Sequence, residues 1–208
     1  MIKRLSLSIL LILVSLCFGC KSKTEERNPE SKKETEDSEN YNKVAMTIKN
    51  YGTITIELYP DVAPITVEHF IYLVKNGLYD GTDFIRMQQD FVLQGGANCK
   101  NTDTIKGEFS SNGVENNISH TKGIVSMARA TDYDSGSSQF FIMLSDKYTS
   151  SLDGLYAAFG KIIDGWDVIE KILNDIDSSY FTNDYYGVYM GFFKEDHFIK
   201  IEKAELIK

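Results

Sequence analysis

The chain has 208 residues, of which 42% are hydrophobic and 25% are charged, and its formal net charge is −8. This length suits one domain with appendages, and the hydrophobic fraction is too high for a chain that is disordered throughout. The acidic balance excludes nucleic acid as the main partner, and the three cysteines are too few for the disulfide framework of a small secreted protein.

The first 19 residues are typical of a signal peptide for export. Lys3 and Arg4 form a basic start, and residues 5–18 form an almost continuous apolar run. A membrane-spanning helix needs about 20 apolar residues, whereas this run of about 14 fits the apolar region of a signal peptide.

The apolar run ends in Cys17-Phe18-Gly19-Cys20. This ending resembles the lipidation motif of bacterial lipoproteins, in which the cysteine receives a lipid and becomes the mature N-terminus. That motif prefers Leu and then a small residue where Cys17 and Phe18 stand. The resemblance implies a lipoprotein-type signal over residues 1–19, with Cys20 as the lipid attachment site. The alternative is an ordinary cleaved signal peptide with an incidental cysteine.

A charged, flexible tether is expected at residues 20–43. Of the 23 residues from 21 to 43, 13 are charged and only Tyr41 is apolar. Such a segment cannot bury enough surface to offset the entropy of ordering it. Its six positive and seven negative charges are mixed, which does not favour a polybasic contact with a membrane.

Residues 44–208 form the expected folded domain. The signal carries a charge of +2 and the tether −1, which leaves −9 on these 165 residues. A chain of this length buries roughly 70% of its extended surface, so it can build a sizeable core.

The domain is expected to open with a β-hairpin and a helix. Residues 44–48 and 54–58 alternate apolar and polar side chains, and Asn50-Tyr51-Gly52 separates them. Pro64 then opens a helix, which Gly77 is expected to end. The apolar residues at helical spacing are Val67, Phe70, Ile71 and Val74.

Short apolar runs predict the remaining strands. They lie at residues 84–87, 91–94, 124–128, 139–144, 157–162 and 198–207. A second helix is expected at residues 166–174, with Trp166, Ile169 and Leu173 on one side. Many short strands and two helices favour a closed β-barrel with helices over its ends, because closure removes exposed strand edges.

Two segments combine polar residues with strands that should be buried. They lie at residues 84–96 and at 126–130 with 138–142. Strand alternation places Phe84, Arg86 and Gln94 on surfaces distinct from those of Ile85 and Leu93. An arginine and a glutamine beside aromatic residues indicate an apolar groove with a few fixed donors. The alternative is that Arg86 pairs with a nearby carboxylate on the barrel wall.

These segments resemble the signature of the cyclophilin-type peptidyl-prolyl cis-trans isomerases. The pattern F-x-R-x(4)-F-x-x-Q-G-G is met by Phe84, Arg86, Phe91, Gln94, Gly95 and Gly96. The patterns S-M-A-x-A and S-Q-F-F are met at residues 126–130 and 138–141. Leu152-Asp153-Gly154 and Phe159-Gly160-Lys161 match a later block. The matches cover most of residues 44–208, in the family's order and spacing.

The resemblance implies a fold and a reaction. The family fold is mainly β, a closed eight-stranded antiparallel barrel capped by two α-helices. The reaction is rotation about an X-Pro bond in a peptide or protein, and no covalent bond is broken. The resemblance therefore implies no cofactor and no metal, and the wide spacing of His69, His120 and His197 fits no metal-binding motif.

The resemblance also implies roles for individual residues. Arg86 would polarise the twisting amide, and Phe91 and Gln94 complete the catalytic set. The substrate-binding residues would be Val92, Ala128, Arg129, Ala130, Gln139, Phe141, Leu152 and Tyr156. The apolar members would form the proline pocket, and the backbone of residues 128–130 would hold the flanking peptide.

Three positions depart from the eukaryotic family pattern. Val92 stands where methionine is usual, and Tyr156 stands where many members carry a pocket histidine. Tyrosine keeps an aromatic wall and a hydroxyl group, so catalysis is expected to survive. Ser151 replaces the tryptophan associated with cyclosporin binding, so weak cyclosporin binding is expected.

An aromatic-rich insertion is expected near residues 177–197, because this stretch is longer than the corresponding family turn. Eight aromatic residues lie within residues 180–198. A large exposed aromatic patch would favour a surface for client proteins. The alternative is that the insertion folds over the barrel and buries its own aromatic side chains.

The leading hypothesis is a monomeric, lipid-anchored isomerase that assists the folding of exported proteins. It would reside in the bacterial cell envelope, on the periplasmic face or the cell surface. Its partners would be proline-containing peptide segments and, through a lipid on Cys20, a membrane. The alternative is a proline-peptide-binding or holdase module with the same fold and little catalysis, and a weaker one is a structural envelope lipoprotein.

Overall fold

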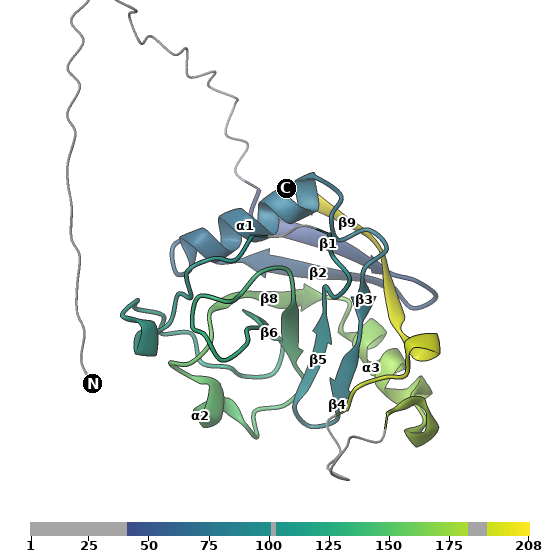
Figure 1. Cartoon of the computed structure of the whole chain (residues 1–208). Helices are drawn as coiled ribbons and strands as arrows, with labels where there is room; N and C mark the ends of the chain where they lie inside the picture. Colours follow the sequence, from purple (N-terminus) through teal and green to yellow (C-terminus); the bar gives the residue numbers. More distant parts are fainter. Residues whose placement is uncertain (1–40, 101–102, 183–190) are drawn as a thin grey trace, which may run out of the picture. The chain divides into compact units, whose positions relative to one another are not determined.

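The computed structural model describes residues 41–100, 103–182 and 191–208. The predicted signal, Cys20 and residues 20–40 of the tether lie outside this part of the chain. The described residues form an antiparallel sheet that curves into a nearly closed barrel, with α1 and α3 packed against it (Figure 1). In spatial order the strands are β3-β9-β1-β2-β8-β6-β7-β5-β4.

The strands are β1 Lys43–Ile48, β2 Gly52–Leu58, β3 Asp83–Phe84, β4 Arg86–Gln88, β5 Val92–Gly95, β6 Ile124–Met127, β7 Phe140–Met143, β8 Ala158–Asp164 and β9 Ile199–Ile207. The α-helices are α1 Pro64–Lys75, α2 Thr149–Leu152 and α3 Trp166–Asp175. Short 3₁₀ turns lie at η1 Ser110–Asn112, η2 Ser178–Tyr180 and η3 Glu195–His197.

The predicted mainly β barrel is confirmed, but the described part of the chain has nine strands rather than eight. The extra strand arises because the single strand predicted over residues 84–87 is divided at Ile85 into two strands. The part before Ile85 is β3, which pairs with β9, and the part after it is β4, which pairs with β5. Phe84 is fully buried in the barrel interior with Leu93, whereas Arg86 lines a surface cavity. The prediction that Phe84 lies on a surface distinct from that of Leu93 is therefore wrong.

The predicted hairpin is confirmed. β1 and β2 pair from Lys43↔Glu57 to Ile48↔Gly52. In the turn, Asn50 has a φ of 71° and Gly52 a φ of 132°. Asparagine and glycine are the residues that adopt such positive φ values most readily, which explains their place in this turn.

α1 begins at Pro64 as predicted and covers the barrel with an apolar face. Phe70 is fully buried, and its ring lies 5.7 Å from that of Phe140 in an edge-to-face arrangement. Gly77 has a φ of 62° and donates its N–H to the carbonyl of Val74 at 3.0 Å. Gly77 thus ends the helix as expected.

α3 confirms the second predicted helix, but its buried face is broader than predicted. Its buried residues are Val168, Ile169 and Ile172, whereas Trp166 and Leu173 are only half-buried. All three predicted residues contact the core, with Ile169 inside it and Trp166 and Leu173 packed against its edge, and the prediction missed Val168 and Ile172.

Apolar side chains pack on both faces of the sheet. The larger cluster fills the barrel interior and includes Leu93 and Phe140. The smaller cluster contains Val92, Ile124, Phe141, Met143, Leu152 and Ala158. Because successive strand residues point to opposite faces, Phe140 and Phe141 join different clusters. The smaller cluster forms the floor of the site described below.

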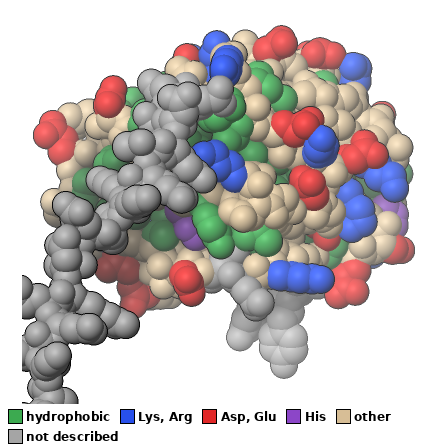
Figure 2. All heavy atoms as spheres, turned by 90° about the horizontal axis from the view of Figure 1, so that it is seen from above, with side chains coloured by type: hydrophobic (Ala, Val, Ile, Leu, Met, Phe, Trp, Pro, Cys, Tyr) green, Lys and Arg blue, Asp and Glu red, His purple; other side chains and the backbone are tan. Residues whose placement is uncertain are grey.

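The end of the domain that carries α1 has a mixed surface. Acidic and basic side chains are interspersed over the described part of this face (Figure 2). Among the residues that the structure describes, no helix has both the length and the apolar character needed to cross a membrane.

A buried carboxylate anchors the start of α1. Glu108 is 2% exposed and accepts hydrogen bonds from the N–H of Ile65 at 3.0 Å and from the N–H and the hydroxyl of Thr66, both at 2.7 Å. The first N–H groups of a helix have no partner within it, and a carboxylate there also interacts favourably with the helix dipole. Glu108 therefore fixes α1 to a segment that follows it by about 40 residues.

Replacing Glu108 tests this anchor. Glu108→Ala should lower the free energy of unfolding by about 2–4 kcal/mol, because it leaves the two buried donors of Thr66 and the partly buried N–H of Ile65 without an acceptor. Urea unfolding followed by circular dichroism measures the change. Glu68→Ala, on the exposed side of α1, is the matched control and should change the free energy of unfolding by less than about 0.5 kcal/mol. Equal effects of the two substitutions would contradict the anchor.

Candidate active site

The strand register places three predicted site residues in one row. Arg86 of β4 pairs directly with Gln94 of β5, and Gln94 pairs with Phe141 of β7. Directly paired residues project from the same face of a sheet. Phe141 belongs to the smaller apolar cluster, so the row lies on the face that carries this cluster.

A cavity of about 250 Å³ lies beside this row. Its floor is apolar, since Val92, Phe141 and Leu152 are each at most 5% exposed. The ring of Tyr156 forms one wall, with its centroid 5.6 Å from that of Phe141 in an edge-to-face arrangement. The cavity is lined by Arg86, Phe91, Val92, Gln94, Ala128, Arg129, Phe141, Leu152 and Tyr156. It can hold a small apolar ring beside a cation.

Arg86 is the cation at this cavity, and two glutamines orient it. Its Nη2 donates to Gln88 Oε1 at 3.0 Å, and its Nη1 donates to Gln94 Oε1 at 3.4 Å. Gln94 in turn donates from Nε2 to Gln139 Oε1 at 2.8 Å. Burial lowers the pKa of Arg86 from its ordinary value, while the nearby Tyr156 acts in the opposite direction. The guanidinium group nevertheless stays protonated at neutral pH.

A second hollow, of about 300 Å³, adjoins the first. The two share Gln94, Ala128 and Arg129. The second is completed by Ala130, Ser135, Ser137 and Gln139. Together the two hollows form a surface long enough for residues that flank a ring bound in the first.

Arg129 braces the wall between the hollows with its side chain. Its Nε and Nη2 donate to the carbonyl of Leu155 at 3.0 and 2.9 Å, and its Nη1 donates to the carbonyl of Ala130 at 2.9 Å. Its Cζ lies 4.6 Å from the centroid of Tyr156 and 4.8 Å from that of Tyr133. The family resemblance implies only backbone contacts at this position and does not indicate this role of the side chain.

The structure also locates Ser151, one of the three departures from the family pattern. Ser151 is exposed, and its hydroxyl donates to the carbonyl of Tyr148 at 2.6 Å. The ring of Tyr148 packs edge-to-face on that of Phe91, with centroids 4.9 Å apart. An aromatic side chain three residues before Ser151 therefore packs on Phe91, which lines the cavity, and the motif comparison did not indicate this contact.

The structure brings all eleven predicted site residues to the two hollows. Nine line the first, and Ala130 and Gln139 line the second. Gln88 and Tyr148 were missed. Neither lies in a motif position. Gln88 lies two residues after Arg86 in β4, so strand alternation could have found it, whereas Tyr148 reaches Phe91 only through the fold of residues 145–152.

A hydrogen-bond network around the buried His120 supports the floor from below. His120 is 1% exposed, and its Nδ1 lies 2.8 Å from Asp153 Oδ1 while its Nε2 lies 3.0 Å from Ser126 Oγ. The imidazole also stacks on the ring of Phe141, with centroids 6.1 Å apart. Ser126 is fully buried, so this arrangement holds Phe141 in place rather than presenting a nucleophile to solvent. Sequence reasoning considered His120 only as a metal ligand and missed this role.

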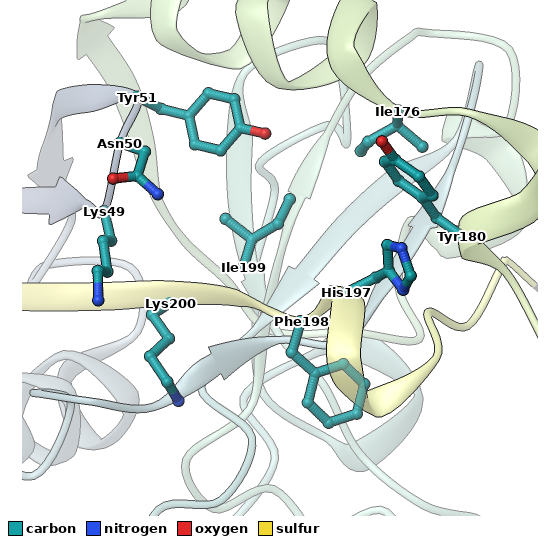
Figure 3. Close-up of a pocket in the computed structure, with 9 residues that line it drawn as sticks. All are labelled: Lys49, Asn50, Tyr51, Ile176, Tyr180, His197, Phe198, Ile199 and Lys200. Atoms are coloured by element: carbon teal, nitrogen blue, oxygen red, sulfur yellow. The ribbon is translucent and has the colours of Figure 1, made fainter.

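A larger cavity, of about 390 Å³, lies between the β1–β2 turn, the end of α3 and the start of β9 (Figure 3). Two of the basic side chains that line this cavity contact carboxylates. Lys200 Nζ lies 2.9 Å from Asp83 Oδ1, and His197 Nδ1 lies 2.8 Å from Asp196 Oδ1. The His197 ring also packs on Tyr180, with centroids 4.2 Å apart. None of the motif residues reaches this cavity, so the candidate active site is the one beside Arg86. Within residues 41–100, 103–182 and 191–208, no cluster of three or more His, Cys, Asp or Glu side chains is placed to hold a metal ion.

The buried His120 predicts a pH dependence of stability. Burial lowers its pKa below the ordinary value of 6.5, although the hydrogen bond to the Asp153 carboxylate acts in the opposite direction. The unfolded chain therefore binds more protons than the folded domain as the pH falls through about 6.5, and stability decreases with falling pH. Burial also lowers the pKa of His69, which contributes with the same sign.

The free energy of unfolding should therefore fall between pH 8 and pH 5.5, with a slope of up to about 1.4 kcal/mol per pH unit for each histidine. His120→Gln should make this slope shallower, and the remaining slope should reflect His69. Urea titrations of both proteins at several pH values provide the measurement. Identical slopes would show that His120 does not resist protonation in the folded domain.

Comparisons with known proteins agree with this geometry. Residues 43–186 match the family model described as cyclophilin type peptidyl-prolyl cis-trans isomerase/CLD. A peptidyl-prolyl cis-trans isomerase of Acinetobacter baylyi is 44% identical over 140 residues, which are 63% of this chain and 72% of that protein. Peptidyl-prolyl cis-trans isomerase A of Dickeya dadantii is 35% identical over 130 residues, which are 58% of this chain and 66% of that protein.

A solved structure is similar over the whole described domain. A cyclophilin-type peptidyl-prolyl cis-trans isomerase from Cryptosporidium parvum, crystallised in the presence of the dipeptide Ala-Pro, superposes with a TM-score of 0.63 at 25% identity. The match covers 80% of this chain and 99% of that one. The barrel, the motif residues gathered at one cavity and the family match lead to one conclusion: the chain belongs to the cyclophilin-type peptidyl-prolyl cis-trans isomerases.

Proposed function

We propose that this isomerase acts on X-Pro bonds of exported proteins, that Arg86 is its catalytic cation, and that a lipid on Cys20 anchors it in the bacterial cell envelope. The observation that carries the catalytic part is the oriented guanidinium group of Arg86 at the edge of an apolar cavity. The proposed location in the cell envelope is supported by the predicted signal peptide and tether.

The reaction is a rotation about one bond, and no covalent bond is broken. The uncatalysed rotation about an X-Pro bond has a barrier of about 20 kcal/mol and takes tens of seconds. The bond loses its partial double-bond character in the transition state, and the prolyl nitrogen then carries a lone pair. An enzyme accelerates the rotation by binding this twisted amide more tightly than either planar form.

Arg86 is suited to that binding. Its guanidinium group can donate to the prolyl nitrogen when the lone pair develops, and it does not have to change protonation state. Gln88 and Gln94 accept from its two terminal nitrogens, so the plane of the group is set before substrate arrives. Partial burial strengthens the interaction because fewer water molecules compete for the charge.

The apolar floor is suited to the proline ring. Phe91, Phe141 and Leu152 line the same cavity as Arg86, so a ring held there places its nitrogen near the cation. Gln94 and Gln139 offer carboxamide groups to the neighbouring peptide carbonyl, and the second hollow takes the flanking residues. The Ala-Pro dipeptide named for the Cryptosporidium parvum structure supports a proline-containing ligand for this fold.

Replacing Arg86 tests the catalytic role. Arg86→Ala should lower kcat/KM by about 100-fold or more, because a preorganised donor to the transition state is lost. Exchange between the cis and trans forms of an X-Pro peptide, measured with the full chain in detergent, provides the readout. Lys161→Ala, an exposed cation on β8, is the matched control and should leave the rate unchanged.

Three outcomes separate the alternatives. Wild-type activity with an inactive Arg86→Ala supports the proposal, and equal activities of the two proteins contradict the role of Arg86. Peptide binding and suppression of aggregation by a wild-type chain that is no faster than buffer would instead favour a holdase.

Replacing Cys20 tests the location. A tether of 24 residues can span about 80 Å when extended, so a lipid at Cys20 leaves the domain free to reach substrates away from the membrane. Cys20→Ala should move the protein from the membrane fraction of the expressing bacterium to the soluble fraction. Cys17→Ala is the matched control and should stay with the membranes. Membrane association that persists in Cys20→Ala would contradict the anchor.

A further inference from the structure

A segment far along the chain pairs with the strand that carries Arg86. The N–H of Met87 donates to the carbonyl of Gly191 at 2.7 Å, and the N–H of Phe193 donates to the carbonyl of Ile85 at 2.9 Å. Phe192 thereby pairs with Arg86 as an antiparallel bridge. β4 has β5 on one side and residues 191–193 on the other.

This close approach depends on a glycine. Gly191 has a φ of 73°, and a Cβ atom at this position would collide with the carbonyl oxygen of Met87. Only glycine combines this backbone conformation with so short a separation between the two segments. The sequence Gly191-Phe192-Phe193 is therefore suited to dock on β4.

The docked segment is held from its other side as well. Phe193 is 3% exposed and stacks on Phe181, with ring centroids 5.0 Å apart. The N–H of Thr182 donates to the carbonyl of Phe192 at 2.8 Å, and the N–H of Lys194 donates to the carbonyl of Tyr180 at 2.8 Å. Residues 191–194 thus lie fixed between residues 180–182 and β4, and two of the aromatic residues in the predicted insertion are buried.

Phe192 differs from these neighbours because its ring is 38% exposed and lies against the candidate catalytic cation. The ring centroid is 5.5 Å from Arg86 Cζ, and the centroid of Phe91 is 5.7 Å from the same atom. A guanidinium group within about 6 Å of a ring centroid is attracted by the ring's quadrupole. Arg86 therefore contacts two aromatic rings in addition to two glutamines.

We propose that Phe192 is a positioning residue for catalysis, which fixes the guanidinium group of Arg86 through ring contact. The proposal rests on the proposed role of Arg86. Gln88 and Gln94 restrain the guanidinium group through its N–H groups, and Phe192 restrains it through a ring contact. Phe192 lies beyond residues 43–186, the part of the chain that matches the family model, so the contact is supplied by this chain's own C-terminal region.

A contact of this kind affects the transition state more than the ground state. The planar peptide bond makes little use of the cation, whereas the twisted amide needs the guanidinium group in one position. Loss of Phe192 should therefore lower kcat/KM while the affinity for a proline peptide stays nearly constant.

The test compares three substitutions at this position in the full chain in detergent. Phe192→Ala should lower kcat/KM by about two- to fivefold, the effect expected from one partly exposed cation–π contact. Phe192→Tyr should restore the wild-type rate because it keeps the ring, whereas Phe192→Leu, which keeps apolar bulk, should not. Tyr72→Ala removes an exposed ring from α1 and is the matched control, with no effect expected.

Two further readouts separate positioning from a general structural effect. The dissociation constant of an X-Pro peptide should change by less than about twofold in Phe192→Ala, and the side-chain Nε–Hε resonance of Arg86 should shift or broaden in its NMR spectrum. In an Arg86→Ala background, Phe192→Ala should have no additional effect on the rate, because its target is absent.

The proposal is overturned by wild-type kcat/KM in Phe192→Ala, by full activity of Phe192→Leu, or by the same loss in the Arg86→Ala background. These results differ from failure of the proposed function, in which Arg86→Ala itself would keep wild-type activity. If Phe192→Ala does not fold, the comparison of Phe192→Tyr with Phe192→Leu decides the question.

Discussion

The register between β4, β5 and β7 is the constraint on which the site depends. It aligns Arg86, Gln94 and Phe141 in one row and, through strand alternation, sends Leu93 and Phe140 into the barrel. A shift by one residue in any of these strands would exchange the polar row for core residues. The interior packing that stabilises the fold therefore also fixes the register of this candidate catalytic row.

Several layers of contact then restrict the mobility of the row. The buried His120 and Ser126 form a hydrogen-bond network behind Phe141 together with the more exposed Asp153. Gln139 continues the chain of hydrogen bonds from Gln94. On the other side, the C-terminal segment docks on β4. A reaction without proton transfer or bond cleavage depends mainly on such fixed electrostatics, because the site has only to favour one shape of the substrate.

Short sequence patterns could predict those elements that are determined by a few neighbouring residues. The hairpin with Gly52, the start of α1 at Pro64 and the motif residues that line the cavity all follow from short patterns. The split of the strand at Ile85 could not be predicted, because it depends on pairing with β9, which lies more than 100 residues away. The roles of His120 and Phe192 have the same origin, because each depends on a tertiary contact. Gln88 lies two residues after Arg86 in β4, so strand alternation could have indicated it, but a motif comparison assigns no function to a residue outside the motif.

The central claim is that the positive charge of Arg86, and not only its shape, stabilises the twisted amide. Replacing Arg86 with citrulline, a neutral analogue of nearly the same shape, tests this claim most directly. Two-dimensional NMR exchange spectroscopy on an X-Pro peptide should then show the cis–trans exchange rate reduced by about tenfold or more, with the peptide still bound. An exchange rate equal to that of the unmodified chain would contradict the account.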